Sequence, residues 1–230
     1  MRTSMRFPIN KALLVQARDR LARRPLLYWI VGGAGSGKTT VCQALSVRLE
    51  MPVYDMDAHI YGAYHHRFSR ERHPVNTAWS TADNGLAWLL AMSWDEFDSF
   101  NQAALPEYLD LLVEDLDRVA PGVGMLIDGG ISNPALLAQA IPARQIACLS
   151  APEHSSIQIW EAFGERKAMK EAVYQLPNPE AAWLKFLEFD TRLTHTILNE
   201  CRENSIPIHL RDKDTSIEEL AERVTRGWGI

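Results

Sequence analysis

A glycine-rich loop between an apolar run and a helical pattern constrains this chain more than any other feature. The run Tyr28 to Val31 is rich in β-forming side chains, and residues 32–39 read Gly-Gly-Ala-Gly-Ser-Gly-Lys-Thr. They fit the pattern G-x-x-x-x-G-K-[ST] in full, and a helical pattern follows from Val41. A backbone without Cβ atoms can wrap a phosphate and aim N–H groups at it, and the next helix adds its positive N-terminal end. The loop therefore predicts binding of a nucleoside triphosphate.

Each residue type in the loop has an expected part in that binding. Lys38 supplies a positive charge to the terminal phosphates, and the Thr39 hydroxyl is an expected ligand of Mg²⁺. The alternative is a glycine-rich turn without a ligand, which would require neither the lysine nor the threonine. The residues expected to contact ATP in this segment are Gly32, Gly33, Ala34, Gly35, Ser36, Gly37, Lys38, Thr39 and Thr40.

Length, charge and cysteine content narrow the class of protein. The 230 residues fit one α/β domain, and 47% apolar content argues against disorder. A net charge of −5 gives no overall attraction to nucleic acid or to an anionic membrane. The three cysteines lie far apart and predict buried thiols of a reducing compartment. No membrane-spanning stretch or secretory signal is evident, so we expect a cytoplasmic protein.

Acidic residues follow two of the predicted strands. Residues 51–57 read as a short strand that ends in Asp55 and Asp57, which as alternate strand residues would both face a cleft. A solvated turn is the alternative. Residues 124–130 read as a buried strand that ends in Asp128 and two glycines. Beside a phosphate loop, Asp128 is an expected partner of Mg²⁺, and the glycines would let a ligand approach the backbone.

Two basic segments stand out in an otherwise acidic chain. Residues 65–73 contain Arg67, Arg70 and Arg72, which either clamp an anionic group of a second substrate or form a solvated charge run. Arg166 and Lys170 share one helical face, where an anion could sit between them, or the face is simply exposed.

The remaining pattern alternates strands and helices. Further strands are expected at 26–31, 145–149 and 206–210, and helices at 11–24, from Ser93 with Glu96 as a capping box, from Pro152, from Asn178, and from Thr215 with Glu218. Pro106 either kinks the second of these helices or begins a new one. Five strands interleaved with helices predict an α/β fold in which a parallel sheet is covered on both faces.

These features together resemble the small P-loop kinases of metabolites and nucleotides, with shikimate and gluconate kinases as nearest kin on the adenylate kinase-like branch. The resemblance rests on residues 32–40 with their Walker A pattern, on Asp55-Met-Asp57, on residues 127–130, and on Arg166 at the position of the lid. It implies a three-layer P-loop NTPase fold with sheet order 2-3-1-4-5. The Arg-Pro-Leu-Leu motif of shikimate kinases is absent beyond the third predicted strand.

The resemblance also implies an organisation and a set of roles. One domain would span 1–230, with an N-terminal helical extension at 1–25, a substrate-binding insertion at 58–94, and a lid at 152–175. Arg211 would lie by the adenine. Catalysis would involve Lys38, Asp55, Asp57 and Arg166, and Mg²⁺ would be held by Thr39, Asp55 and Asp128.

Three functions remain open on the sequence. The first is ATP-dependent phosphorylation of a hydroxyl on a small anionic metabolite, with ATP and Mg²⁺ as cofactors. The second is a kinase of nucleosides or nucleoside monophosphates. The third is an ATP-binding switch or ATPase module without an acceptor. For all three we expect a monomer or homodimer that binds neither nucleic acid nor membrane.

Overall fold

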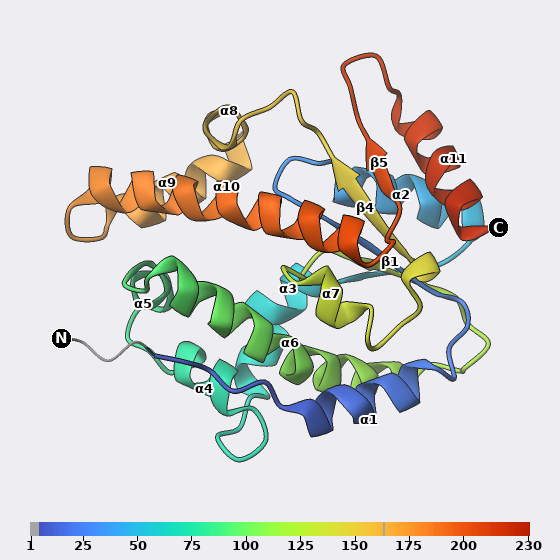
Figure 1. Cartoon of the computed structure of the whole chain (residues 1–230), viewed down its shortest axis with the longest axis horizontal. Coiled ribbons are helices and arrows are strands. Elements are labelled where there is room, and N and C mark those ends of the chain that lie inside the picture. The colour runs from blue at the N-terminus through green and yellow to red at the C-terminus, as the bar shows by residue number, and fades with distance from the viewer. Residues whose placement is uncertain (1–4, 163) are drawn as a thin grey trace.

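A five-stranded, all-parallel sheet forms the centre of the molecule. The computed structural model describes residues 5–162 and 164–230, with side chains described at 5–162 and 166–230. The strands are β1 (Leu27–Gly32), β2 (Val53–Asp55), β3 (Met125–Asp128), β4 (Ile146–Ser150) and β5 (Ile208–Leu210). Their order is β2-β3-β1-β4-β5, and each neighbouring pair is parallel. Figure 1 shows β4 and β5 side by side at one end of this order. The predicted sheet order is therefore confirmed.

Helices fill the connections between the strands. The longer ones are α1 (Lys11–Leu21), α2 (Lys38–Leu49), α6 (Trp94–Leu116), α9 (Gly164–Tyr174), α10 (Pro179–Glu203) and α11 (Ile217–Trp228). The short ones are α3 (Met56–Tyr61), α4 (Pro74–Ser80), α5 (Gly85–Leu90), α7 (Pro134–Leu137), α8 (Ser156–Glu161), and the 3₁₀ helices η1 (Ala63–His66) and η2 (Ala143–Gln145).

Strand β1 shows why the sheet needs a layer of helices on each face. All of its residues are buried, and alternate side chains point to opposite faces. Trp29 and Val31 pack into the larger core cluster, to which α1, α6 and α10 contribute. Tyr28 and Ile30 pack into the smaller cluster, formed with α2 and α11. The α/β architecture with helices on both faces follows from this continuous apolar strand.

The second strand is shorter than predicted, and this changes the direction of one acid. Strand β2 ends at Asp55, because the Asp55 carboxylate caps α3 by accepting the N–H of Ala58 at 2.9 Å. Asp57 therefore lies in the first turn of a helix. The prediction that the two acids share a face as alternate strand residues is wrong.

Other boundaries differ from the prediction for local reasons. Helix α6 runs through Pro106 without ending. Helix α8 begins at Ser156, where Ser155 and Gln158 form a capping box, and not at Pro152. The N-cap of α11 is Ser216, which accepts the N–H of Glu219, whereas Thr215 donates its hydroxyl to Asp212.

The segment 58–94, expected to show little periodicity, folds into short helices α3, η1, α4 and α5. Asn84 caps α5, and Pro74 stands at the start of α4. All three cysteines are buried free thiols, as predicted. Within the described residues, every helix is too short or too polar to cross a membrane.

Candidate functional site

The glycine loop connects the end of β1 to the start of α2. Gly32 has φ of +148°, and a Cβ there would collide with the carbonyl oxygen of Leu149 on the neighbouring strand. Only glycine fits this position. The loop reaches α2 at Gly37, the N-cap, so the free N–H groups of the first helical turn point toward the loop. This is the local geometry that binds phosphate groups.

Lys38 lies across this loop. Its ammonium donates to the carbonyl oxygens of Gly32 at 2.9 Å and Gly33 at 3.0 Å. Ser36 is buried, and its hydroxyl has no hydrogen-bond partner within the described residues. Ala34 lines the cleft described below, whereas Thr40 is exposed on α2. The loop thus presents N–H groups, a cation and an unused hydroxyl.

Two acids meet at the carboxyl edge of the sheet, beside the start of α2. Asp55 and Asp128 are register partners on β2 and β3. Asp128 is 4% exposed, and its Oδ1 has no hydrogen-bond partner among the described residues. Burial raises the pKa of Asp128, while a hydrogen bond from Thr39 and the charge of Lys38 oppose that rise. The structure therefore brings Thr39, Asp55 and Asp128 together, as the sequence predicted.

Asp57 and the loop lysine both lie close to Gly129. A Cβ on Gly129 would stand 2.5 Å from the Asp57 carboxylate and 3.5 Å from Cε of Lys38. The Asp57 carboxylate accepts the backbone N–H of Gly130. The side chain is open at the cleft, yet the cleft walls displace enough water to raise its pKa, and Lys38 partly offsets this. The glycine pair leaves room for Asp57 and Met56, and both glycines also line the cleft, where the predicted approach of a ligand stays a prediction.

A cleft of about 330 Å³ joins Asp57 and Lys38 to side chains from several helices. Six polar residues that line it were not predicted: Tyr61, Asn101, Tyr108, Ser132, Asp190 and Thr194. Only helical spacing in the sequence could have grouped some of them. Asn101 and Tyr108 share a face of α6 with Leu105. Asp190 and Thr194 are four residues apart and share a face of α10. Thr194 also sits above Gly33, where a Cβ would meet its side chain.

The predicted basic residues have different surroundings. Nη1 of Arg211 stands 3.0 Å from the point where a Cβ of Gly37 would lie, so its guanidinium covers the start of α2. Arg166 donates to the carbonyl oxygen of Ile159 at 2.9 Å, and its guanidinium lies 5.6 Å from the Trp160 ring centroid. Arg166 is outside the set of described residues that line the cleft.

The basic cluster at 65–73 is engaged by helix α6. Arg67 donates to both carboxylate oxygens of Asp115 at 2.8 Å, and Arg72 pairs with Asp110 at 2.6 Å and with Glu114. The prediction that Arg67 or Arg72 clamps a substrate is therefore wrong, because carboxylates of the same chain already bind both guanidinium groups. Lys170 likewise pairs with Glu161 at 3.0 Å, so the proposed anion between Arg166 and Lys170 has no support.

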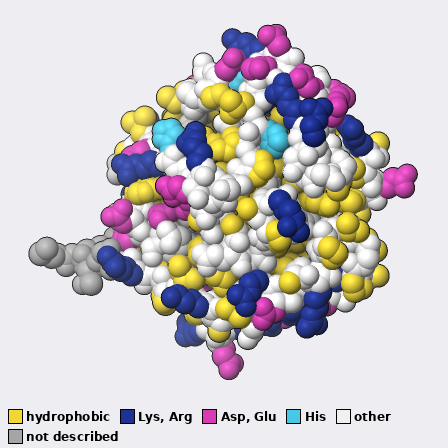
Figure 2. All heavy atoms as spheres, turned by 45° about the vertical axis from the view of Figure 1, so that its right-hand side comes forward, with side chains coloured by type: hydrophobic (Ala, Val, Ile, Leu, Met, Phe, Trp, Pro, Cys, Tyr) yellow, Lys and Arg dark blue, Asp and Glu magenta, His cyan; other side chains and the backbone are white. Residues whose placement is uncertain are grey.

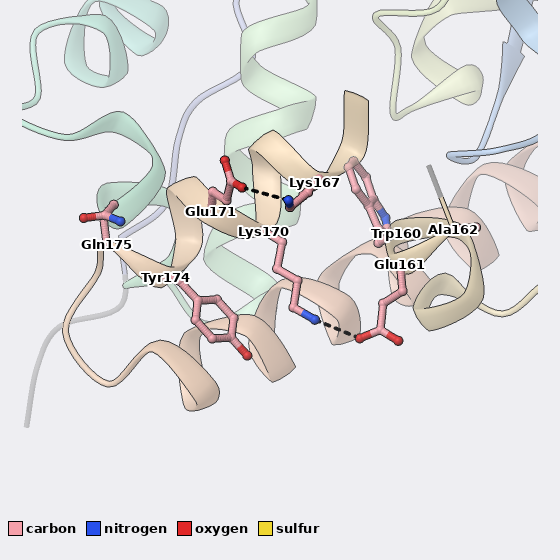
Figure 3. Close-up of a pocket in the computed structure, with 8 residues that line it drawn as sticks. All are labelled: Trp160, Glu161, Ala162, Lys167, Lys170, Glu171, Tyr174 and Gln175. Carbon is pink, nitrogen blue, oxygen red and sulfur yellow. Dashed lines mark hydrogen bonds and ion pairs between the residues drawn. The ribbon is translucent and has the colours of Figure 1, made fainter. Parts of the chain in front are cut away.

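A second hollow, of about 600 Å³, lies between α8 and α9. Figure 3 shows that its charged side chains turn toward one another: Lys170 bonds Glu161, and Lys167 pairs with Glu171 at 3.7 Å. None of the described residues that line it belongs to the glycine loop. The smaller cleft, with its loop, acids and unused hydroxyls, is therefore the candidate site.

Charge and metal ligands are distributed as follows. On the face drawn in Figure 2, basic and acidic side chains are interspersed without a continuous basic surface. Among the residues that the structure describes, no three His, Cys, Asp or Glu side chains are grouped to hold a metal ion by themselves. Magnesium bound with a nucleotide needs fewer protein ligands, because phosphates and waters supply the rest.

Comparison with known proteins shows a likeness in structure but none in sequence family. No family model matches this sequence, and no curated protein matches it. The chain is similar to the crystal structure of TT1252 from Thermus thermophilus, with 20% identity and a TM-score of 0.48, over 88% of this chain and 96% of that chain. The name of that protein states no activity. The function proposed for this chain therefore rests on the geometry of its own site.

Proposed function

We propose that this chain is an ATP-dependent kinase that phosphorylates a hydroxyl group of a small molecule. One observation supports this above all. Cε of Lys38 and the Asp57 carboxylate lie 3.5 Å and 2.5 Å from the point where a Cβ of Gly129 would stand, and both residues line a single cleft. A phosphate held by the first would lie next to an acceptor hydroxyl held by the second.

The donor half of the site is the glycine loop with α2. Its N–H groups and Lys38 bind the phosphates of ATP, and Arg211 adds positive charge above Gly37. The fold that this implies is the three-layer P-loop NTPase fold, which the parallel sheet and its strand order support. The segment α8–α9 is the proposed lid, since Trp160 and Met169 line the cleft. Arg166 joins the site only if that segment shifts from its present contacts with Ile159 and Trp160.

The residues present fit a bound Mg²⁺. Asp128 has a buried oxygen without a partner, and the Thr39 hydroxyl bonds the same carboxylate. Hard oxygen ligands of this kind suit Mg²⁺, and Asp55 stands beside them in register. When bound, the ion would neutralise phosphate charge during transfer.

The proposed reaction needs one proton acceptor. The acceptor hydroxyl oxygen forms a bond to the γ-phosphorus, the bond from that phosphorus to the β–γ bridging oxygen breaks, and ADP leaves. The hydroxyl proton passes to the Asp57 carboxylate. Asp57 is favoured over Asp55 for this role, because Asp55 caps α3 and Asp57 lines the cleft. Its raised pKa brings this base nearer to neutrality.

The test combines ATP binding with acceptor-dependent turnover. Purified protein is titrated with Mg·ATP by calorimetry, and ADP formation is then followed with pooled metabolites. We expect Lys38→Ala to weaken ATP binding by on the order of tenfold or more, since it removes a charged hydrogen-bond donor. We expect Asp57→Asn to lower kcat roughly 100-fold or more with ATP affinity nearly unchanged.

The matched control is Asp83→Asn, which removes an exposed carboxylate outside the cleft lining. It should leave ATP affinity and turnover as they are. ATP hydrolysis that no metabolite pool stimulates would contradict the kinase and favour an ATPase or switch. Loss of ATP affinity in Asp57→Asn would contradict the role given to Asp57.

A nucleoside is a second candidate acceptor. Tyr61, Tyr108 and Trp160 line the cleft, and aromatic rings can stack on a base. Stimulation by nucleosides in the same assay, with no response to sugars or polyols, would identify it.

A further inference from the structure

The part of the cleft beyond the glycine loop is acidic and hydroxyl-rich. We define it as the acceptor pocket, formed by Asp57, Tyr61, Asn101, Tyr108, Ser132 and Asp190. Resting on the kinase function proposed above, we propose that the acceptor is a hydroxylated compound without a negative charge, such as a polyol, sugar, nucleoside or amino alcohol.

The first support is the scarcity of positive charge. Within residues 5–162 and 166–230, the side chains that line the cleft include one cation, Lys38. Its ammonium bonds the carbonyl oxygens of Gly32 and Gly33, on the phosphate side. In the present arrangement, a carboxylate or phosphate on the acceptor would meet no second cation among the described side chains that line the cleft.

The second support is Asp190, which enters the pocket from α10. Its carboxylate makes no hydrogen bond or ion pair with the part of the chain that the structure describes, although it lines the cleft. Asp57 accepts a backbone N–H of Gly130 and retains acceptor capacity. Two carboxylates with unused lone pairs attract hydroxyl or ammonium donors and repel anions.

The third support comes from the basic segment 65–73, whose arginines had suggested an anionic substrate. The guanidinium groups of Arg67 and Arg72 are bound by Asp110, Glu114 and Asp115 of α6. Neither arginine lines the cleft. Arg70 is exposed and does not line the cleft either. The positive charges of the basic segment therefore lie outside the acceptor pocket.

The neutral polar side chains of the acceptor pocket also favour a ligand that can form hydrogen bonds. The hydroxyl of Tyr108 lines the cleft, and Nδ2 of Asn101 is buried with no hydrogen-bond partner among the described residues. A ligand that carries several hydroxyls can bond to such groups and to both carboxylates. The expected acceptor is therefore rich in hydroxyl or amine groups.

The experiment sorts candidate acceptors by charge. A small-molecule extract freed of nucleoside triphosphates is separated by ion exchange into anionic, neutral and cationic pools. Each pool is incubated with the full-length protein and Mg·ATP, and ADP formation is compared with the acceptor-free rate, with Lys38→Ala as the blank. We expect the neutral or cationic pool to stimulate ADP formation, and the anionic pool to have little effect.

The outcomes separate the two proposals. Stimulation by the anionic pool, alone or to the same extent as the others, overturns this inference and leaves the kinase standing. If ATP binds in a Lys38-dependent manner and no pool stimulates turnover, the kinase function itself fails and the inference falls with it.

A variant pair tests Asp190 directly with the compound isolated from the stimulating pool. Asp190→Asn should lower kcat/KM for that compound by about tenfold or more, because a charged hydrogen-bond acceptor is lost, with ATP affinity unchanged. Glu188→Gln removes a carboxylate on the exposed side of the same helix, where it pairs with Arg192, and should change neither quantity. If Asp190→Asn behaves like Glu188→Gln, Asp190 does not contact the acceptor and its assignment is wrong.

Discussion

Gly129 lies beside the two charged groups on which the proposed reaction depends. Its φ is +68°, a conformation that side chains with a Cβ rarely adopt. The absent side chain leaves room for the Asp57 carboxylate and for Lys38, which both approach the position that a Cβ would take. A side chain at this residue would therefore disturb the proposed base and come close to the loop lysine.

Substitution of Gly129 should damage both stability and the site. Gly129→Ala should cost about 1–3 kcal/mol of unfolding free energy, from the positive φ and from displacement of Asp57. Thermal unfolding followed by tryptophan fluorescence measures this loss. Kinase turnover should fall by more than ATP affinity, because the displaced group is Asp57.

Gly122 provides the comparison, since a Cβ there meets nothing within 4 Å and its φ is not positive. Gly122→Ala should leave the melting temperature and turnover close to those of the parent. A Gly129→Ala protein as stable as Gly122→Ala would contradict the close approach of Asp57.

At the scale of elements, α6 holds the segment between β2 and α6 in place through a partly buried network of ion pairs and hydrogen bonds. Arg67 bonds Asp115, and Tyr54 donates to the same carboxylate at 2.6 Å. Nε2 of His73 lies 2.9 Å from Oδ2 of Asp110, and both side chains are buried. Burial alone would raise the pKa of Asp110, Glu114 and Asp115, but the hydrogen bonds from their partners lower all three.

This network should contribute stability that depends on pH. A carboxylate with a lowered folded pKa stabilises the fold above its ordinary pKa near 4, and the contribution is lost as pH falls through the folded value. Arg67→Met removes the partner of Asp115 and leaves it partly buried, so we expect a loss of about 1–3 kcal/mol at neutral pH. Acid unfolding should also begin at a higher pH, as circular dichroism across a pH series would show.

Arg70 lies in the same segment and is exposed, with no ion pair to any residue that the structure describes. Arg70→Met should unfold at the same pH as the parent protein. Equal acid midpoints for the Arg67→Met and Arg70→Met variants would show that the network does not stabilise the fold.

At the scale of the whole molecule, helix α1 is part of the main core. Leu13, Leu14, Ala17 and Leu21 are buried, and the last three belong to the cluster that covers one face of the sheet. Arg24 extends this contact by donating to the carbonyl oxygen of Val119 at 2.7 Å. The helix predicted at 11–24 is therefore present as α1 (Lys11–Leu21), and one of its faces packs on the core.

The contribution of α1 to global stability can be measured with neighbouring substitutions. Leu14 is 6% exposed, so Leu14→Ala should cost about 2–5 kcal/mol through lost burial and a cavity. Val15 is 44% exposed on the same helix, and Val15→Ala should stay within about 0.5 kcal/mol of the parent. Denaturant unfolding gives both values. Similar losses in the two variants would contradict the packing of one face of α1 on the core.

Local patterns were enough to predict the glycine loop, the five strands, their parallel arrangement and the residues at the carboxyl edge of the sheet. Each depends on neighbouring residues: a glycine run, an apolar run and the helical period after it. The strand order came from the family resemblance, and the structure confirms it. Boundaries were less accurate, because a single capping side chain, such as Asp55 or Ser155, decides where a helix begins.

The partners of side chains were decided by tertiary structure. Arg67 and Arg72 looked free because Asp110, Glu114 and Asp115 lie some forty residues further along the chain. Asp190 and Thr194 look like ordinary helix residues until α10 packs over the glycine loop. The sequence by itself determined a glycine loop on a parallel sheet, since that motif is local. Which charges remain available to a second substrate was decided only by packing, because a side chain's availability depends on distant residues that reach it first.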